Sequence, residues 1–79
     1  ELYRLELDPN CFYESAPHSD GVEETLTVVD GEMNVTVGDE MVPLQVGDTL
    51  VFAGNLSHRY ENTSNSMCVL HLIIHYSNV

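Results

Sequence analysis

The sequence contains no lysine and only two arginines against 13 acidic residues, so the formal net charge of its 79 residues is −11 at pH 7. Proteins hold nucleic-acid backbones and anionic lipid surfaces largely through lysine and arginine, and a strongly acidic surface repels both. We therefore expect that this chain binds neither nucleic acid nor a membrane by itself.

Long apolar runs are also absent, since no stretch approaches the roughly 20 apolar residues that span a bilayer. The given residues enter directly on a strand-like pattern, without a charged leader or an apolar signal core. The hydrophobic content of 43% is too high for disorder. We expect a soluble, globular, cytoplasmic protein. Because the sequence starts at Glu1 and not at Met, we expect a domain of a longer chain. The two cysteines, Cys11 and Cys68, are expected to be reduced.

No segment shows a helical period of useful length. Instead, about seven short segments of strand-like composition are separated by turn residues, which is typical of an antiparallel sandwich or barrel. We therefore predict an all-β fold with residues 1–79 forming one domain. A domain of this size buries only about 60% of its unfolded surface. Because the last segment, Met67–Tyr76, is apolar on both faces, we predict a homodimer.

The dipeptide Asp30-Gly31 is typical of a two-residue hairpin, which would fix the register of the segments on either side of it. Glu24 then falls on the apolar face of this hairpin. A carboxylate in such a place must reach the rim, be protonated, or find a cation or a hydrogen-bond donor. The predicted register opposes Val29 to Glu32, Val28 to Met33, Leu26 to Val35 and Glu24 to Val37.

The stretch Gly47–Asn62 reads GDTLVFAGNLSHRYEN and predicts a second hairpin, because two turn-type pairs enclose the short apolar segment Thr49–Phe52. Beyond the second turn, His58, Tyr60 and Asn62 alternate with charged residues. In a strand this alternation places His58 and Tyr60 on one face. Tyr60 is then either a pocket wall that offers its hydroxyl or part of the core.

A proline and a pair of histidines give two further expectations. Pro43 restricts the segment Glu40–Gln45 to a sheet edge or an irregular place, because proline cannot donate a ladder hydrogen bond. His71 and His75 share one face of the last strand but lie roughly 13 Å apart, so they cannot hold one ion together. We interpret them as packing or interface residues.

The stretch Gly47–Asn62 resembles the second sequence motif of the cupin superfamily, which is Gly, five residues, Pro-x-Gly, two residues, His, three residues, Asn. Gly47, His58 and Asn62 fall in register with it, whereas Ala53 stands at the Pro and Asn55 at the second Gly. The first cupin motif is HxH, three or four residues, Glu, six residues, Gly. This motif aligns with His18, Asp20, Glu24 and Gly31, with Asp20 in place of the second His.

The resemblance implies a jelly-roll barrel in which His18, Glu24 and His58 converge at the mouth, with Asp20 as a further metal ligand. Two imidazoles with one or two carboxylates suit a divalent transition metal such as Zn, Fe, Mn or Ni. The alternative is that His18 is a solvated loop residue, Glu24 a rim carboxylate and His58 a core histidine. Leu26, Met33 and Tyr60 would form the mainly apolar wall of a ligand pocket.

The residues of the two motifs are similar to those in the carboxy-terminal cupin of bacterial transcriptional regulators that carry an XRE-type helix-turn-helix (HTH) domain. That resemblance implies a sensor domain that dimerises and receives a small-molecule effector, while DNA is bound by a domain outside these 79 residues. The competing hypothesis is a small metal-dependent cupin enzyme, such as a dioxygenase or isomerase. A third hypothesis is an interaction or storage module with a filled barrel.

The first testable prediction concerns charge. We expect no retardation of duplex DNA by the isolated chain in a mobility-shift titration at low salt, because 13 acidic residues face only two arginines. A basic DNA-binding protein serves as the positive control. Tight binding that weakens with added salt would contradict the prediction.

Overall fold

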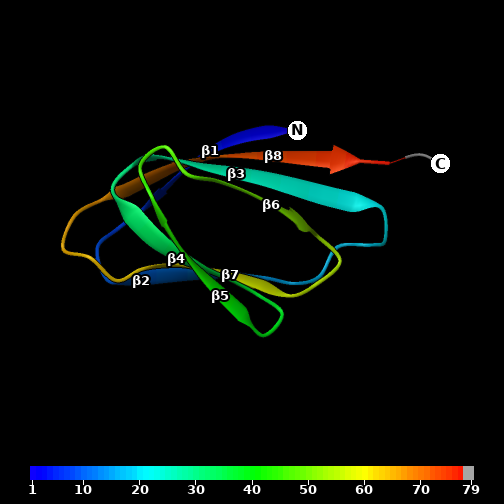
Figure 1. The fold of residues 1–79 in the computed structure, drawn as a ribbon, viewed down its shortest axis with the longest axis horizontal. Helices are drawn as coiled ribbons and strands as arrows, with labels where there is room; N and C mark the ends of the chain where they lie inside the picture. The colour runs from blue at the N-terminus through cyan, green and yellow to red at the C-terminus, as the bar shows by residue number, and fades with distance from the viewer. Residues whose placement is uncertain (78–79) are drawn as a thin grey trace.

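The protein is a sandwich of two antiparallel four-stranded sheets (Figure 1), seen in a computed structural model that describes residues 1–77. This confirms the predicted all-β class. The described part of the chain contains no helix that could cross a membrane. The eight strands are β1 (Leu2–Leu7), β2 (Cys11–Ser15), β3 (Val22–Asp30), β4 (Glu32–Val37), β5 (Glu40–Gln45), β6 (Thr49–Ala53), β7 (His58–Asn62) and β8 (Cys68–Tyr76).

The first sheet has the strand order β1-β8-β3-β6 and the second has the order β2-β7-β4-β5. We call them sheet A and sheet B; in Figure 1 sheet A lies along the top and sheet B below it. Strand β5, which contains Pro43, is an edge strand of sheet B, as predicted from its proline. The long strands β3 and β8 occupy the centre of sheet A.

The core lies between the sheets and is built from alternate residues of each strand. In β3, Val22, Glu24, Leu26 and Val28 are buried, with their neighbours exposed or half-buried. The predicted inner face of this segment is therefore confirmed. The two cysteines are free, with Cys11 exposed and Cys68 in the core.

The predicted hairpin at Asp30-Gly31 is wrong, because β3 pairs with β6 and β8, whereas β4 pairs with β5 and β7. At Gly31 the chain passes from sheet A to sheet B. Gly31 has a φ of 82°, and a Cβ on it would lie 2.6 Å from the carbonyl oxygen of Met67. The glycine thus permits a close backbone approach at a crossover between sheets.

The second predicted hairpin, within Gly47–Asn62, is also wrong, although both of its strands exist. Strand β6 joins the edge of sheet A beside β3, and β7 lies between β2 and β4 in sheet B. The turn that follows Ala53 therefore crosses the end of the sandwich. This crossing carries His58 away from the sheet that holds β3 and positions it on the opposite wall.

Gly31 and Gly47 provide a matched test of the close approach at the crossover. Both have positive φ, but a Cβ on Gly47 would have no heavy atom within 4 Å. We expect Gly47→Ala to lower the free energy of unfolding by about 1 kcal/mol through backbone strain alone, and Gly31→Ala to lower it by about 2–4 kcal/mol because of the added backbone clash. Urea unfolding measures both. Equal losses would show that the contact with Met67 is unimportant.

Candidate metal centre and ligand cavity

Three side chains from different elements converge between the sheets. His18 comes from the loop after β2, Glu24 from β3 in sheet A, and His58 is the first residue of β7 in sheet B. The Glu24 Oε2 atom lies 3.1 Å from His58 Nε2 and 3.7 Å from His18 Nε2. One ligand atom from each residue lies within 4.8 Å of the other two.

Gly54 holds the loop of His18 beside β3. The His18 backbone N–H donates to the Gly54 carbonyl at 2.8 Å, and the Gly54 N–H donates to the Val22 carbonyl at 2.8 Å. A Cβ on Gly54 would lie 2.9 Å from Glu24 Oε2. A side chain at this position would press on the carboxylate that both histidines approach and would force it or Val22 to shift.

The hydrogen bonds around the cluster determine which atoms face each other. His58 Nδ1 lies 2.9 Å from the carbonyl oxygen of Leu56, which can only accept, so Nδ1 carries the proton. In the neutral imidazole, Nε2 then presents its lone pair to Glu24 Oε2. The other carboxylate oxygen, Oε1, accepts a hydrogen bond from the Tyr60 hydroxyl at 3.1 Å.

Glu24 Oε2 is buried and has no hydrogen-bond partner within residues 1–77. A buried carboxylate oxygen that faces the lone pair of an imidazole nitrogen is unfavourable unless a cation or a proton lies between them. Two imidazole nitrogens and one carboxylate oxygen form a donor set suited to Zn, Fe, Mn or Ni. The residues present therefore fit a divalent metal, and three ligands would leave coordination positions open.

A cavity of about 450 Å³ adjoins the cluster. Its apolar wall comes mainly from β1 and β8, and its polar groups come from the metal-site candidates and the residues around them. No arginine or lysine lines this cavity. The lining residues are Tyr3, Leu5, Glu6, Leu7, Tyr13, Ser15, His18, Glu24, His58, Tyr60, Leu72 and Ile74.

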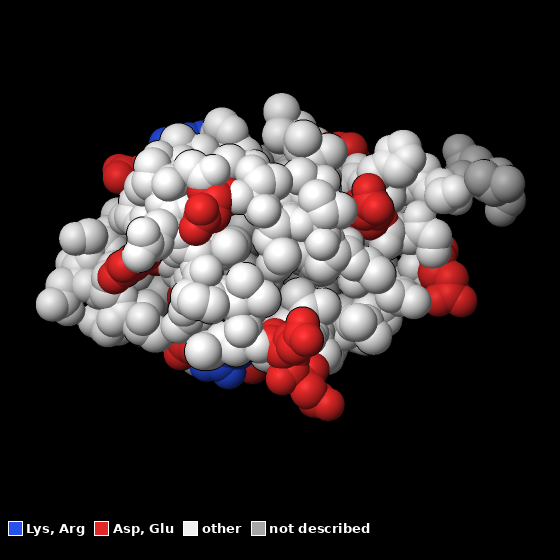
Figure 2. All heavy atoms as spheres, in the orientation of Figure 1, with Lys and Arg blue, Asp and Glu red and all other residues white. Residues whose placement is uncertain are grey.

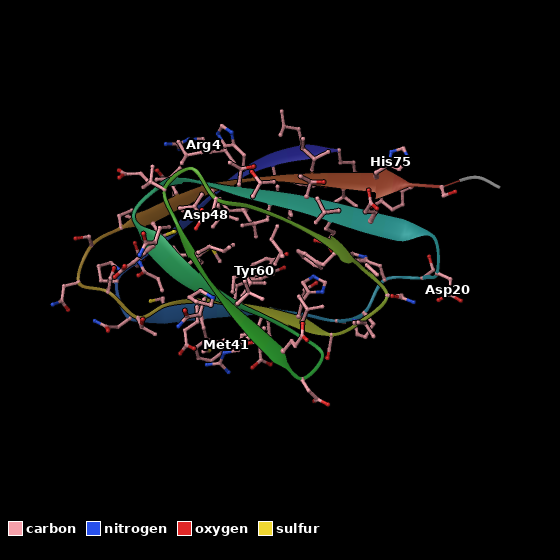
Figure 3. The ribbon with its side chains drawn as sticks, in the orientation of Figure 1. Arg4, Asp20, Met41, Asp48, Tyr60 and His75 are labelled. Atoms are coloured by element: carbon pink, nitrogen blue, oxygen red, sulfur yellow. The ribbon has the colours of Figure 1, made fainter. Side chains whose placement is uncertain are left out.

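Tyr60 connects the cavity to the cluster. Its side chain lies between the two sheets (Figure 3), almost fully buried, with its ring stacked on Tyr13 at a centroid distance of 6.1 Å. Burial, together with the negative charge of Glu24, raises the pKa of the Tyr60 hydroxyl above its ordinary value. The hydroxyl therefore keeps its proton and donates it in the hydrogen bond to Glu24.

The structure does not bring every predicted site residue to this place. Asp20, the predicted additional ligand, is exposed at the end of the sandwich (Figure 3) and accepts a hydrogen bond from Asn55 Nδ2 at 3.0 Å. Leu26 and Met33 are buried in the core but do not line the cavity. Asp20 and Asn55 are two of the positions at which the sequence departs from the cupin motifs, and here they bond to each other.

Sequence reasoning missed most of the cavity wall. It is lined by Tyr3, Leu5 and Leu7 of β1 and by Leu72 and Ile74 of β8. Because His71 and His75 share one face of the last strand, alternation puts Leu72 and Ile74 on the other face. Alternation does not predict that β1 pairs with β8, and this pairing brings both strands opposite Tyr60.

The sequence matches the cupin domain family over residues 3–75, and the chain therefore belongs to the cupin family. It is 32% identical over 76 residues to the HTH-type transcriptional regulator SutR of Escherichia coli (strain K12), a match that covers 96% of this chain and 43% of SutR. The chain thus spans less than half the length of this curated relative.

The structure is similar to solved cupin structures. The cupin domain of an XRE family transcriptional regulator from Enterobacter cloacae superimposes with a TM-score of 0.94 at 32% identity, over 98% of this chain and 81% of that chain. A predicted oxalate decarboxylase from Thermotoga maritima has a TM-score of 0.84 at 23% identity, over 96% of this chain and 65% of that chain. The likeness to XRE regulator cupins is thus confirmed, and the fold is also found in that predicted enzyme.

The hydrogen bond between Tyr60 and Glu24 can be tested through stability. We expect Tyr60→Phe to lower the free energy of unfolding at neutral pH by about 1–3 kcal/mol, because the buried carboxylate loses a donor. Urea denaturation of the metal-free protein measures the loss. Tyr13→Phe, on the exposed partner of the ring stack, is the control and should change stability by less than about 0.5 kcal/mol. Equal effects would show that the hydroxyl of Tyr60 is unimportant.

Proposed function

We propose that this domain is the effector-sensing and dimerising cupin of a bacterial HTH-type transcriptional regulator that acts in the cytoplasm. A small molecule binds in the cavity between the sheets, beside a divalent metal held by His18, Glu24 and His58. The observation that carries the proposal is the buried, unpartnered Oε2 of Glu24 at the edge of a 450 Å³ cavity, in a chain similar to regulator cupins.

The relationship to regulators supports a sensory role. The match to SutR covers nearly all of this chain but only 43% of that protein, which leaves room for a separate DNA-binding domain in a longer chain. The net charge of −11 agrees with this division, because a sensor domain has no need to bind DNA.

The surroundings of the three donors support a bound metal. Leu56 holds the proton of His58 on Nδ1, so that Nε2 is free to ligate, and Tyr60 occupies one oxygen of Glu24, so that the other is free. When bound, a divalent cation would supply a Lewis-acidic group with open positions for an effector. The residues of this chain orient its ligands, two of which, Glu24 and His58, are buried.

The cavity wall supports a small organic effector with an apolar body. Leucine, isoleucine and tyrosine side chains provide most of the surface, and a cavity of about 450 Å³ falls in the usual range for small-molecule sites. Because no arginine or lysine lines it, an acidic group on the effector would find no protein cation there.

A metal-dependent cupin enzyme is the second candidate, favoured by the same three donors and by the fold shared with a predicted oxalate decarboxylase. The acid and base groups argue against it. Glu24 is occupied by the cluster, and Tyr60 holds its proton tightly because burial raises its pKa. The remaining carboxylate of the lining, Glu6, is exposed and paired with Arg4 at 3.0 Å. We therefore favour the sensor.

Metal content tests the proposed centre. The wild type and the variants His58→Ala and His71→Ala would be purified without a histidine tag, reconstituted with Zn²⁺ and measured by elemental analysis. We expect about one metal per chain in the wild type and in His71→Ala, whose histidine is exposed on β8, and a large loss in His58→Ala.

Two outcomes would contradict this assignment. A wild type without stoichiometric metal after reconstitution would leave a metal-free ligand cavity and remove the enzyme alternative. Metal retained by His58→Ala would show that the three-residue assignment is wrong even if the domain is a sensor.

A further inference from the structure

An apolar row crosses the outer face of sheet A over all four strands. In the strand register, Leu2 of β1 pairs with Ile73 of β8, Ile73 with Thr25 of β3, and Thr25 with Val51 of β6. Leu2 is 70% exposed, Val51 54% and Ile73 48%. Because Leu72 and Ile74 point into the core, Ile73 points outward on this central strand. We call these four residues the apolar row.

The positions on either side of the apolar row are nearly free of net charge. The row is flanked in register by Arg4, His71 and two threonines on one side, and by His75, Glu23 and an alanine on the other. Arg4 and Glu23 are the only formal charges among these positions, and Arg4 is also paired with Glu6 of β1 at 3.0 Å. Together these three residues carry a net charge of −1. Arg4 and His75 point away from sheet B in Figure 3.

Most of the acidic residues therefore lie elsewhere, and Figure 2 shows several of them spread over the side of the molecule between the two sheets. Within the described residues, the exposed apolar side chains of sheet B do not form a row across all its strands. Its Phe12 is 56% exposed, but the Arg59 guanidinium lies 3.9 Å from the ring centroid and also pairs with Glu14 at 2.9 Å. The apolar row is thus distinguished both by its exposed apolar side chains and by its low charge.

These properties suit a second copy of the same chain. Two chains that each carry a charge of −11 repel one another, and this repulsion is weakest where surfaces of low charge meet and the acidic sides stay in solvent. A basic partner would instead be attracted to the acidic sides. A two-fold contact requires a patch that complements itself, and a row with aliphatic residues at both ends and a polar flank on each side meets that requirement.

We propose that two copies of this chain dimerise face to face through the outer surface of sheet A, with the apolar row at the centre of the interface. The inference rests on the proposed dimerisation and specifies its surface. Ile73 lies on a central strand and is the inner aliphatic residue of the row, so it is the side chain whose replacement weakens the dimer most.

Sedimentation velocity over a roughly hundredfold range of protein concentration tests the proposal. The wild type is expected to show a mass of twice 8.8 kDa. Ile73→Glu and Val51→Glu should each raise the dimer dissociation constant by at least about tenfold, because each buries a carboxylate in the interface. Met41→Glu is the matched control, since it adds the same charge at an exposed apolar residue of sheet B and should leave the dimer unchanged.

The possible outcomes distinguish a wrong interface assignment from a failure of dimerisation. A wild-type dimer that survives both sheet A substitutions, or that Met41→Glu weakens equally, would overturn the apolar row as the interface while dimerisation stands. A wild type that stays at 8.8 kDa at every concentration would overturn dimerisation as well. Circular dichroism of each variant identifies loss of fold, and Val51, on an edge strand, provides the result should Ile73→Glu unfold.

Discussion

The arrangement of the site depends on one buried carboxylate. Glu24 projects from the centre of sheet A into the space between the sheets, where an unpaired charge would cost several kcal/mol. Its two oxygens are approached by Tyr60 and His58 from sheet B and by His18 from the loop after β2. The same carboxylate thus joins the two sheets and defines the polar end of an otherwise apolar cavity. Gly54 leaves the space that this side chain needs.

The departures from the cupin motifs have a structural explanation in this chain. Asp20 stands where the motif has a second histidine, and Asn55 stands where it has a glycine, and the two side chains bond at 3.0 Å on the rim. This contact ties the loop of His18 to the turn before His58. Asp20 thus contacts the turn before His58 and is not a fourth ligand beside His18. The cluster keeps three donors, His18, Glu24 and His58.

Local patterns in the sequence predicted which face of each strand is buried, but not which strands pair. Alternation placed Glu24, His58 and Tyr60 toward the interior, and Pro43 marked an edge strand. The dipeptide Asp30-Gly31 led to a wrong hairpin prediction. A turn signal predicts that the chain bends, but it does not determine whether the two flanking strands pair with each other. Pairing in this sandwich is non-local, since β3 lies between β6 and β8. The cavity wall depends on the same long-range pairing, so β1 and β8 could not be assigned to it from sequence.

Strands β1 and β8 connect the cavity with the outer face of sheet A. Leu72 and Ile74 line the cavity while Ile73, between them, points outward, and Tyr3 lines it while Leu2 lies in the apolar row. β1 is an edge strand, hydrogen-bonded to β8 on one side only, whereas β8 lies between β1 and β3. An effector that binds the dimer more tightly than the monomer favours the dimer, and one that binds the monomer more tightly favours the monomer. If the proposed effector site and the proposed dimer surface are correct, these two strands would connect effector binding to the association of two chains.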